Sequence, residues 1–350
     1  MYNTWKRILA LCLALLMVLS CFAACSNNGG QTETTAPVAT ESPEEAKVLK
    51  VLTLGHSLAL DAGRMLNLVA HAEGYEHMVI GTLYYAGCPL NKHVEFLTNN
   101  SAEYSLHISS TETPDEPPEK MENVTMLNAI KYDQWDIVVM QGGVFELADD
   151  ATYKAGYIQT IQKHVNDNKL NPTVQFVWNM TWVPPVDDDL RATYTSEPNI
   201  YIKNYEKFNN DRTTLYNLVT ECVKNNILTD DTFVDMIPSG TVFENALSSY
   251  LTEKDIHRDY AHATDLTRLM TAYTWYCVLT GVEQLTEIKV DSVPRKFLVS
   301  TLGSGDWTLT DSQKAIILES VNNALKNPLQ MTQSQLTEAP ADYIPVTDVK

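Results

Sequence analysis

Two short stretches of the sequence contain residue types that could carry out acyl transfer together. An apolar run ends at Gly55-His56-Ser57, and Asp259 and His262 stand three residues apart in the stretch RDYAH, far along the chain. A serine hydroxyl needs a base that takes its proton, and a histidine base needs a carboxylate that holds its tautomer and stabilises the imidazolium. We therefore consider Ser57 a candidate nucleophile, His262 its base and Asp259 the orienting carboxylate.

Each stretch alone has a plainer interpretation. A serine directly before a helix can be an N-cap that satisfies the first turn, and an Asp-x-x-His pair by itself is a weak signal. His257, two residues after Asp255, is a rival to His262 as the base. His56 could also compete, but neighbouring side chains at a strand end tend to point apart, which favours a structural or substrate-facing role for it.

The elements that must position these residues are strands that alternate with helices. The run 48–54 predicts a strand, and the near-continuous apolar run 135–140 is typical of a strand buried on both faces of a parallel sheet. Strands separated by helical segments of this size predict an α/β fold with a mostly parallel, two-sided sheet. Further strands are expected at 77–85, 174–179 and 232–237, and helices after the first strand up to residue 74, from about residue 126, at 153–165, at 205–225 and at 266–280.

The residues that follow the first three predicted strands are of types that can bind a ligand or take part in catalysis. They read Gly55-His56-Ser57, Gly87-Cys88 and Gln141-Gly142-Gly143, and each contains a glycine that lets the backbone approach a bound group. Ligands of open parallel sheets bind outside the carboxyl ends of the strands. We therefore expect the functional site at this edge, with Ser57 beside backbone donors that favour a developing anion.

Composition limits the partners. The chain has 350 residues, 44% of them hydrophobic, which is enough for a substantial core, and its formal net charge is −19. Such a charge repels a phosphate backbone, so it argues against nucleic acid binding.

The first 25 residues have the build of a lipoprotein-type signal peptide. Lys6-Arg7 precede an apolar stretch, and Phe22-Ala23-Ala24-Cys25 resembles a lipobox whose cysteine is lipidated, with Cys21 as an alternative. A plain secreted protein is the competing interpretation. Residues 26–47 predict a flexible linker. The sequence thus predicts export and a lipid anchor that holds the protein on the outer side of a membrane.

The body of the chain reads as one domain, 48–329, followed by a polar tail at 330–350. Two polar stretches, 99–123 and 184–198, are expected to be loop excursions. The acidic triplet 187–189 lies in the second and predicts a solvated loop rather than a metal site. The three body cysteines show no metal-type spacing and are expected to be buried thiols: Cys88, Cys222 and Cys277.

The order of these motifs resembles the SGNH (GDSL-type) hydrolases. The likeness is greatest to a branch of bacterial exported proteins that opens with GNSFxxD and carries GGCSL and RDxxH later. Here those motifs read GHSLALD, YAGCPL and RDYAH, and IPSGT at 237–241 and WYxxLTG at 275–281 also match. The resemblance extends from about residue 47 to residue 281.

The resemblance implies a three-layer α/β/α sandwich with a mostly parallel, flavodoxin-like sheet and a serine esterase site. Ser57 would be the nucleophile, His262 the base and Asp259 its partner. The oxyanion hole would consist of the backbone N–H groups of Ser57 and Gly87 and a side-chain amide. The family's usual Gly-x-Asn turn is missing, so Gln141 takes the amide role by likeness to carbohydrate acetylesterases of the superfamily. No metal or organic cofactor is implied.

Two functions follow from these patterns. The first is an exported serine esterase that removes acyl groups, above all acetyl groups, from carbohydrate or glycan substrates. The second is a lipid-anchored carbohydrate-binding protein that keeps the SGNH fold with weak or no hydrolase activity, which the missing Gly-x-Asn and the altered Gly-His-Ser favour. A lipase fits less well, because 99–123 shows no large apolar lid.

Overall fold

The computed structural model describes residues 48–196, 206–299 and 304–343, which all lie in one compact unit, Lys47–Lys350. The expected signal peptide with Cys21 and Cys25, the linker up to residue 47 and the end of the tail from residue 344 lie outside the described residues. In the described ranges no helix combines the length and the apolar character needed to cross a membrane.

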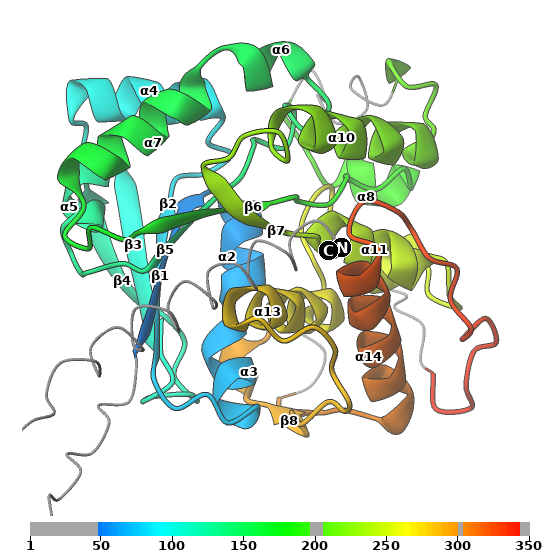
Figure 1. The fold of residues 1–350 in the computed structure, drawn as a ribbon. Coiled ribbons are helices and arrows are strands. Elements are labelled where there is room, and N and C mark those ends of the chain that lie inside the picture. Colours follow the sequence, from blue (N-terminus) through cyan, green and yellow to red (C-terminus); the bar gives the residue numbers. More distant parts are fainter. Residues whose placement is uncertain (1–47, 197–205, 300–303, 344–350) are drawn as a thin grey trace, which may run out of the picture. The chain divides into compact units, whose positions relative to one another are not determined.

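A seven-stranded sheet forms the middle layer, in the order β4-β3-β2-β1-β5-β6-β7 (Figure 1). β2, β1, β5, β6 and β7 run parallel to one another. β3 pairs antiparallel with β2, and β4 pairs antiparallel with β3. The parallel strands follow the flavodoxin-like order 2-1-3-4-5. The bounds are β1 Leu49–Gly55, β2 Met78–Tyr84, β3 Tyr104–Ser110, β4 Glu119–Val124, β5 Ile137–Met140, β6 Gln175–Asn179 and β7 Phe233–Ile237.

Helices cover both faces of the sheet, which confirms the expected α/β/α sandwich (Figure 1). One face carries α2 Ser57–Gly63, α3 Leu66–Ala72, α11 Ser239–Leu247, α13 Asp265–Thr280 and α14 Asp311–Lys326. The other carries α4 Leu90–Asn99, α5 Met126–Ile130, α6 Asp150–Lys154, α7 Tyr157–Asn168 and α10 Arg212–Asn226. Shorter elements are α8 Asp188–Ala192, α12 Glu253–Ile256, the 3-10 turn Arg295–Phe297 and the two-stranded β8 Ser292–Val293 and β9 Trp307–Thr308.

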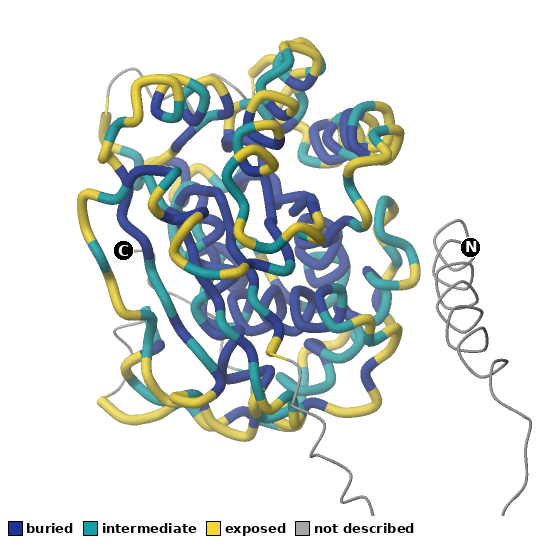
Figure 2. Tube along the Cα trace, turned by 60° about the vertical axis from the view of Figure 1, so that its left-hand side comes forward, coloured by how far each residue is buried: buried dark blue, intermediate teal, exposed yellow. Residues whose placement is uncertain are grey.

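The strands contribute to two separate cores because their side chains alternate between the faces. In β5, Ile137 and Val139 pack with α2, α3 and α13, whereas Val138 and Met140 pack with the helices of the opposite face. A strand buried on both faces needs apolar residues at every position, which explains its continuous apolar run. The strands and the inner sides of the helices are accordingly the buried part of the chain (Figure 2).

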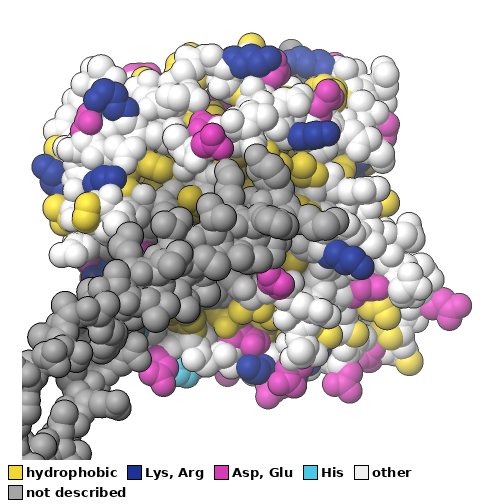
Figure 3. Space-filling model, in the orientation of Figure 1, with side chains coloured by type: hydrophobic (Ala, Val, Ile, Leu, Met, Phe, Trp, Pro, Cys, Tyr) yellow, Lys and Arg dark blue, Asp and Glu magenta, His cyan; other side chains and the backbone are white. Residues whose placement is uncertain are grey.

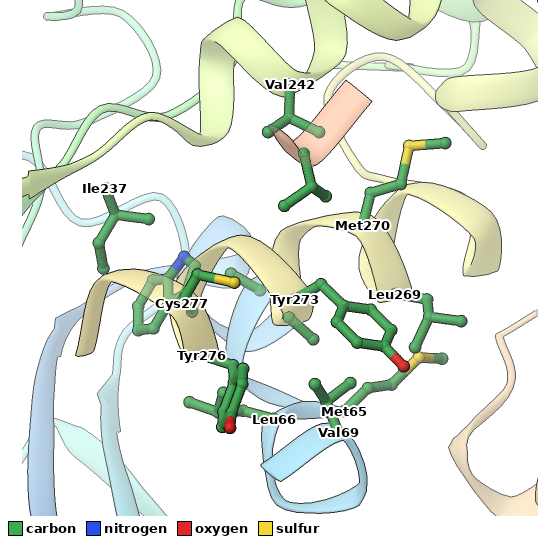
Figure 4. Packing of buried hydrophobic residues seen from close by; sticks show 14 of the residues in the cluster. Met65, Leu66, Val69, Ile237, Val242, Leu269, Met270, Tyr273, Tyr276 and Cys277 are labelled. Atoms are coloured by element: carbon green, nitrogen blue, oxygen red, sulfur yellow. The ribbon is translucent and has the colours of Figure 1, made fainter. Parts of the chain in front are cut away.

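α13 is the central helix of the first core. Nearly all its residues are buried, including the charged Arg268 and Asp265, which pair with each other. Figure 4 shows Leu269, Tyr273 and Tyr276 of α13 over Met65 and Val69, at the start and middle of α3. The expected helix after the first strand is therefore two short helices, α2 and α3, that both pack under α13.

One sequence-based expectation about this domain is wrong, and two further features were not predicted. The stretch 99–123 is no loop excursion, because β3 and most of β4 pair there as an antiparallel extension of the sheet. A further helix, α14, follows the one expected at 266–280. The tail is not loose where it is described: Tyr250 N–H donates to Leu336 C=O at 3.0 Å, and Tyr343 Oη donates to Asp255 at 2.8 Å.

The face shown in Figure 3 carries basic and acidic side chains side by side, and acidic ones gather along its lower edge. The excess of acidic groups follows from the 44 Asp and Glu against 25 Lys and Arg in the chain. Such a surface attracts cations more than anionic partners.

We expect Gly240→Ala to destabilise the fold. A Cβ at residue 240 would lie 2.7 Å from the backbone oxygen of Thr181, and Gly240 N–H already donates to Met180 C=O at 2.8 Å, so α11 would have to move away from the end of β6. The free energy of unfolding should fall by about 1–3 kcal/mol in urea titrations, with an unchanged slope. Gly305→Ala, where a Cβ meets open space, is the matched control. Equal stability of the two variants would contradict the close approach.

Candidate active site

The carboxyl end of β1 lies beside that of β5, and the connections that follow these two strands run over opposite faces of the sheet. β1 pairs with β2 on one side, Gly55 opposite Tyr84, and with β5 on the other, Leu54 opposite Met140. The connection after β1 runs over one face of the sheet, and those after β2 and β5 run over the other. This is the switch point at which open α/β sheets bind ligands.

Ser57 is the first residue of α2 and is partly exposed. It is not the N-cap. His56 holds that position, and its Nδ1 accepts the N–H of Leu58 at 3.4 Å. Within the described residues no side chain forms a hydrogen bond with the Ser57 hydroxyl. The plainer interpretation of this serine as a cap is therefore wrong, and its hydroxyl is available for chemistry.

His56 is a buried structural residue. Its Nε2 donates to the C=O of Gly142 at 3.0 Å, so the ring ties the start of α2 to the end of β5. Burial lowers the pKa of His56 to about 4, more than its bond to Gly142 raises it. A ring that is neutral and uses both nitrogens cannot serve as a competing base, which favours the structural alternative for this residue.

Asp259 and His262 form a preorganised pair in the loop between α12 and α13. Nδ1 of His262 lies 2.9 Å from both carboxylate oxygens of Asp259, and the N–H groups of Ala261 and His262 donate to the same carboxylate at 3.0 and 2.9 Å. Burial raises the pKa of Asp259, but these donors outweigh it and hold the pKa far below its usual range. An ionised Asp259 therefore keeps the proton on Nδ1 of His262 and leaves Nε2 to accept one.

Hydrogen bonds join this loop to α2, which begins at the end of β1. The N–H of Ala263 donates to Asp61 Oδ2 at 3.0 Å, and Arg258 Nη1 donates to the two carboxylate oxygens of Asp61 at 3.0 and 3.1 Å. No hydrogen bond joins Ser57 to His262 among the described residues, and catalytic hydrogen bonds are often long without a substrate. The structure thus places His262 and Asp259 in the neighbourhood of Ser57.

The rival base His257 differs from His262 in its surroundings. Its ring is fully buried, packs at 5.4 Å from the ring of Phe243, and lies 3.5 Å from a guanidinium nitrogen of Arg212. Burial and that guanidinium lower its pKa well below the usual value. Asp255, its expected partner, instead accepts from the N–H and hydroxyl of Thr252 at the start of α12. His262 is therefore the better placed base.

Gly87 lies in an exposed turn after β2, with a positive φ of 60° and open space where a side chain would project. A non-glycine residue is strained in this conformation. Its N–H donates to no described residue, as an oxyanion donor requires. Cys88, which follows it, is buried, and burial raises the pKa of its thiol to about 12, so this residue is no nucleophile.

Gln141 is the first member of a buried polar chain along the strand ends. Nδ2 of Asn179 donates to Gln141 Oε1 at 2.9 Å, the Ser239 hydroxyl donates to Asn179 Oδ1 at 2.7 Å, and Trp275 Nε1 donates to that hydroxyl at 3.2 Å. This chain orients the Gln141 amide, so that its Nε2 faces Gly55, where a Cβ would meet it at 2.9 Å. Nε2 is buried and has no hydrogen-bond partner among the described residues.

Sequence reasoning missed Asn179, Ser239 and Glu146. Asn179 is the last residue of β6, and Ser239 lies just after β7 at the start of α11. The strand-end rule that selected Gln141 could therefore have found both. Glu146 accepts the N–H groups of Leu90 and Gly143, both at 3.0 Å, and joins the loops that follow β2 and β5. Its partner Leu90 is 56 residues away in the sequence, and no local pattern marks this contact.

No metal site is found in the part of the chain that the structure describes: no three His, Cys, Asp or Glu side chains there are grouped as ligands. Asp187 caps α8, Asp188 pairs with Arg191, and Asp189 pairs with Lys254. The three body cysteines are free and buried, as expected.

A pocket of about 140 Å³ lies beside α2, on the side of β2 and β3. The buried hydroxyl of Ser109 in its wall has no hydrogen-bond partner among the described residues. A polar pocket of this size has room for ordered water. It does not include Ser57 or His262 and is lined by Leu60, Gly63, Arg64, Ile80, Thr82, His107, Ser109, Pro117 and Pro118.

The fold and this site define a doubly wound α/β protein with a serine, a histidine and an aspartate at the switch point of its sheet. Residues 50–297 match the family described as "Domain of unknown function (DUF4886)". The chain belongs to this family.

A solved structure gives the same fold. A DUF4886 family protein from Bacteroides uniformis is 21% identical, with a TM-score of 0.67, over 83% of this chain and 100% of that one. A proposed SGNH hydrolase from Slackia heliotrinireducens (14% identity, TM-score 0.42, 66% and 98%) and a lipase from a goat rumen metagenome (9%, 0.36, 65% and 95%) are more distant, and likeness at that level carries no inference. Among curated proteins the sequence has no significant match.

The buried His56 should make the fold acid-sensitive. Between pH 6.5 and about 4 the unfolded chain binds a proton that the folded ring does not, so stability is lost as the pH falls through this window, by about 3 kcal/mol at its lower end. His56→Asn keeps an N-cap and removes the titration. Urea titrations at pH 7, 5.5 and 4 should show a flatter dependence for the variant. A slope as steep as that of the wild type would contradict this assignment.

Proposed function

We propose that this protein is an SGNH-type serine esterase that removes acyl groups, above all acetyl groups, from carbohydrate or glycan substrates. The observation that carries the proposal is the Asp259–His262 pair, bonded at 2.9 Å in a loop that contacts the helix of Ser57. A base with its tautomer already set, beside a serine hydroxyl without a partner, is the arrangement that acyl transfer needs.

In the proposed reaction, Ser57 Oγ attacks the carbonyl carbon of the ester while Nε2 of His262 takes the hydroxyl proton. The tetrahedral intermediate collapses when His262 gives that proton to the alcohol that leaves, and the acyl group remains on Ser57. Water then attacks the acyl-enzyme and loses a proton to His262, which releases the carboxylic acid and restores the serine. Asp259 stays ionised and stabilises the imidazolium in both halves of the reaction.

The oxyanion would be stabilised by the N–H groups of Ser57 and Gly87 and by Nε2 of Gln141. The last assignment is supported by the bond from Asn179, which turns the Gln141 oxygen away and leaves the amide donor without a partner near Gly55. Each such donor is worth about 3 kcal/mol of transition-state stabilisation. The proposed mechanism requires no metal and no organic cofactor.

Aromatic side chains near His262 support a carbohydrate substrate. The ring of Tyr260 lies 5.5 Å from that of His262, and the ring of Tyr194 lies 5.0 Å from that of Tyr260. Both tyrosines are partly exposed, and such rings offer an apolar face together with a polar hydroxyl. In the same proposal the protein is exported and held at a membrane by a lipid on Cys25 or Cys21, which gives access to glycans outside the cell.

The second candidate is a lipid-anchored carbohydrate-binding protein with this fold and weak or no hydrolase activity. Two observations favour it: Ser57 and His262 share no hydrogen bond, and Gln141 Nε2 is buried. A lipase is less well supported, because 104–110 and 119–124, where a lid would lie, are strands of the sheet.

The esterase proposal predicts that a fluorophosphonate probe labels the domain from Lys47 onward at Ser57. Labelling should disappear in Ser57→Ala and slow by about 10³-fold or more in His262→Ala. His257→Asn, once melting shows it folded, should label at the wild-type rate. Wild-type protein that no probe labels at any pH would favour the binding protein.

The same proposal predicts a preference for short acyl chains. On p-nitrophenyl acetate, butyrate and octanoate, kcat/KM should be highest for acetate. Highest activity on octanoate would overturn the acetylesterase assignment while leaving the serine mechanism intact.

A further inference from the structure

Asp61 is a buried carboxylate to which the proposed reaction assigns no step. It lies one helical turn after Ser57 in α2 and is only 4% exposed. Residues four apart in a helix lie on the same face. The Asp61 carboxylate and the Ser57 hydroxyl therefore project from the same side of α2.

The partners of Asp61 are the two ends of the loop that carries His262. Arg258 Nη1 donates to its two oxygens at 3.0 and 3.1 Å, and the N–H of Ala263 donates to Oδ2 at 3.0 Å. These residues enclose the Asp259–His262 pair, and Arg258 N–H also donates to His262 C=O at 2.9 Å. One carboxylate on the helix of Ser57 thus holds the loop before and after the imidazole.

The guanidinium of Arg268 is a second positive charge beside the Asp61 carboxylate. Arg268 of α13 is 1% exposed, and its Nε lies 3.4 Å from Asp61 Oδ1. Arg268 Nη1 also bonds Asp265 Oδ1 at 3.1 Å, and Asp265 accepts the N–H of Val299 at 2.9 Å. Removing charges from water is costly, so a buried ionic cluster often adds little net stability compared with apolar packing. What such a cluster does supply is a defined geometry.

We propose that Asp61 is a positioning residue that sets the distance between the Ser57 hydroxyl and the His262 imidazole. The inference rests on the proposed esterase function, in which those two groups exchange a proton. α2 supplies the nucleophile and, one turn later, the carboxylate that fixes where the base lies. A displacement of a base by about 1 Å can lower a rate by about 10²-fold.

The test compares Asp61→Asn with Asp265→Asn. The amide keeps the shape of the side chain, but its NH₂ end cannot accept from Arg258 or Ala263. Asp61→Asn should lower kcat and the fluorophosphonate labelling rate by about 10²-fold with an unchanged KM, because only the proton-transfer geometry is disturbed. Asp265→Asn removes a similarly buried partner of the same Arg268 and should keep the wild-type kcat. Equal losses in the two variants, or an unchanged kcat in Asp61→Asn, would overturn the proposal.

A structural readout separates this inference from the esterase function. NMR of the His262 ring should show shifted resonances in Asp61→Asn and unshifted ones in Asp265→Asn. If the wild type neither labels nor hydrolyses esters, the function is wrong, and the positioning role is then decided by these resonances alone. Should Asp61→Asn fail to fold, Asp61→Glu retains the charge and lengthens the side chain. It should fold, shift the His262 resonances and lower kcat; wild-type values of both would overturn the proposal.

Discussion

The pairing of β1 with β2 on one side and with β5 on the other determines where the candidate functional groups lie. Because β1 is central and parallel to both neighbours, its end at Gly55 is level with the ends of two other strands. The connections that follow β1 and β5 leave these ends over opposite faces of the sheet. The turn with Gly87 and the Gln141 side chain come to this point from either side.

The groups around Ser57 are held by polar contacts inside an apolar structure. Asn179 and Ser239 continue the chain that starts at Gln141, and each uses its side chain on the next member. Such contacts are strong where water is excluded, and an unpaired member is costly. The unpaired Nε2 of Gln141 is therefore the exception that a bound oxyanion would explain, and it is the reason for preferring Gln141 as the amide donor.

The histidines near the site differ in their surroundings more than in their sequence context. His56, His93 and His257 are completely buried, and burial lowers the pKa of each below the usual value, so all three are neutral at physiological pH. His262 is partly exposed and faces the ionised Asp259. Among the described residues Asp259 orients the His262 ring through Nδ1, and no carboxylate forms such a bond with the other three rings.

The sequence by itself determined the properties that depend on local patterns. Apolar periodicity identified the parallel strands, the strand-end rule identified Ser57, Gly87 and Gln141, and the spacing of three residues was enough for Asp259 and His262 to pair within one turn. The strands β3 and β4 were missed because β3 alternates apolar residues with polar ones and β4, the edge strand, is mostly polar, so neither has the continuous apolar run of the parallel strands.

Only the tertiary structure decided which distant residues meet. The bond between Asp61 and Ala263 joins residues that are 202 positions apart, and the bond between Gln141 and Asn179 joins two strand ends. No local pattern shows which of these residues meet, because the free energy of these contacts depends on burial and direction, which arise when the sheet and its helices pack. The sequence therefore located the candidate groups, and packing set the distances between them.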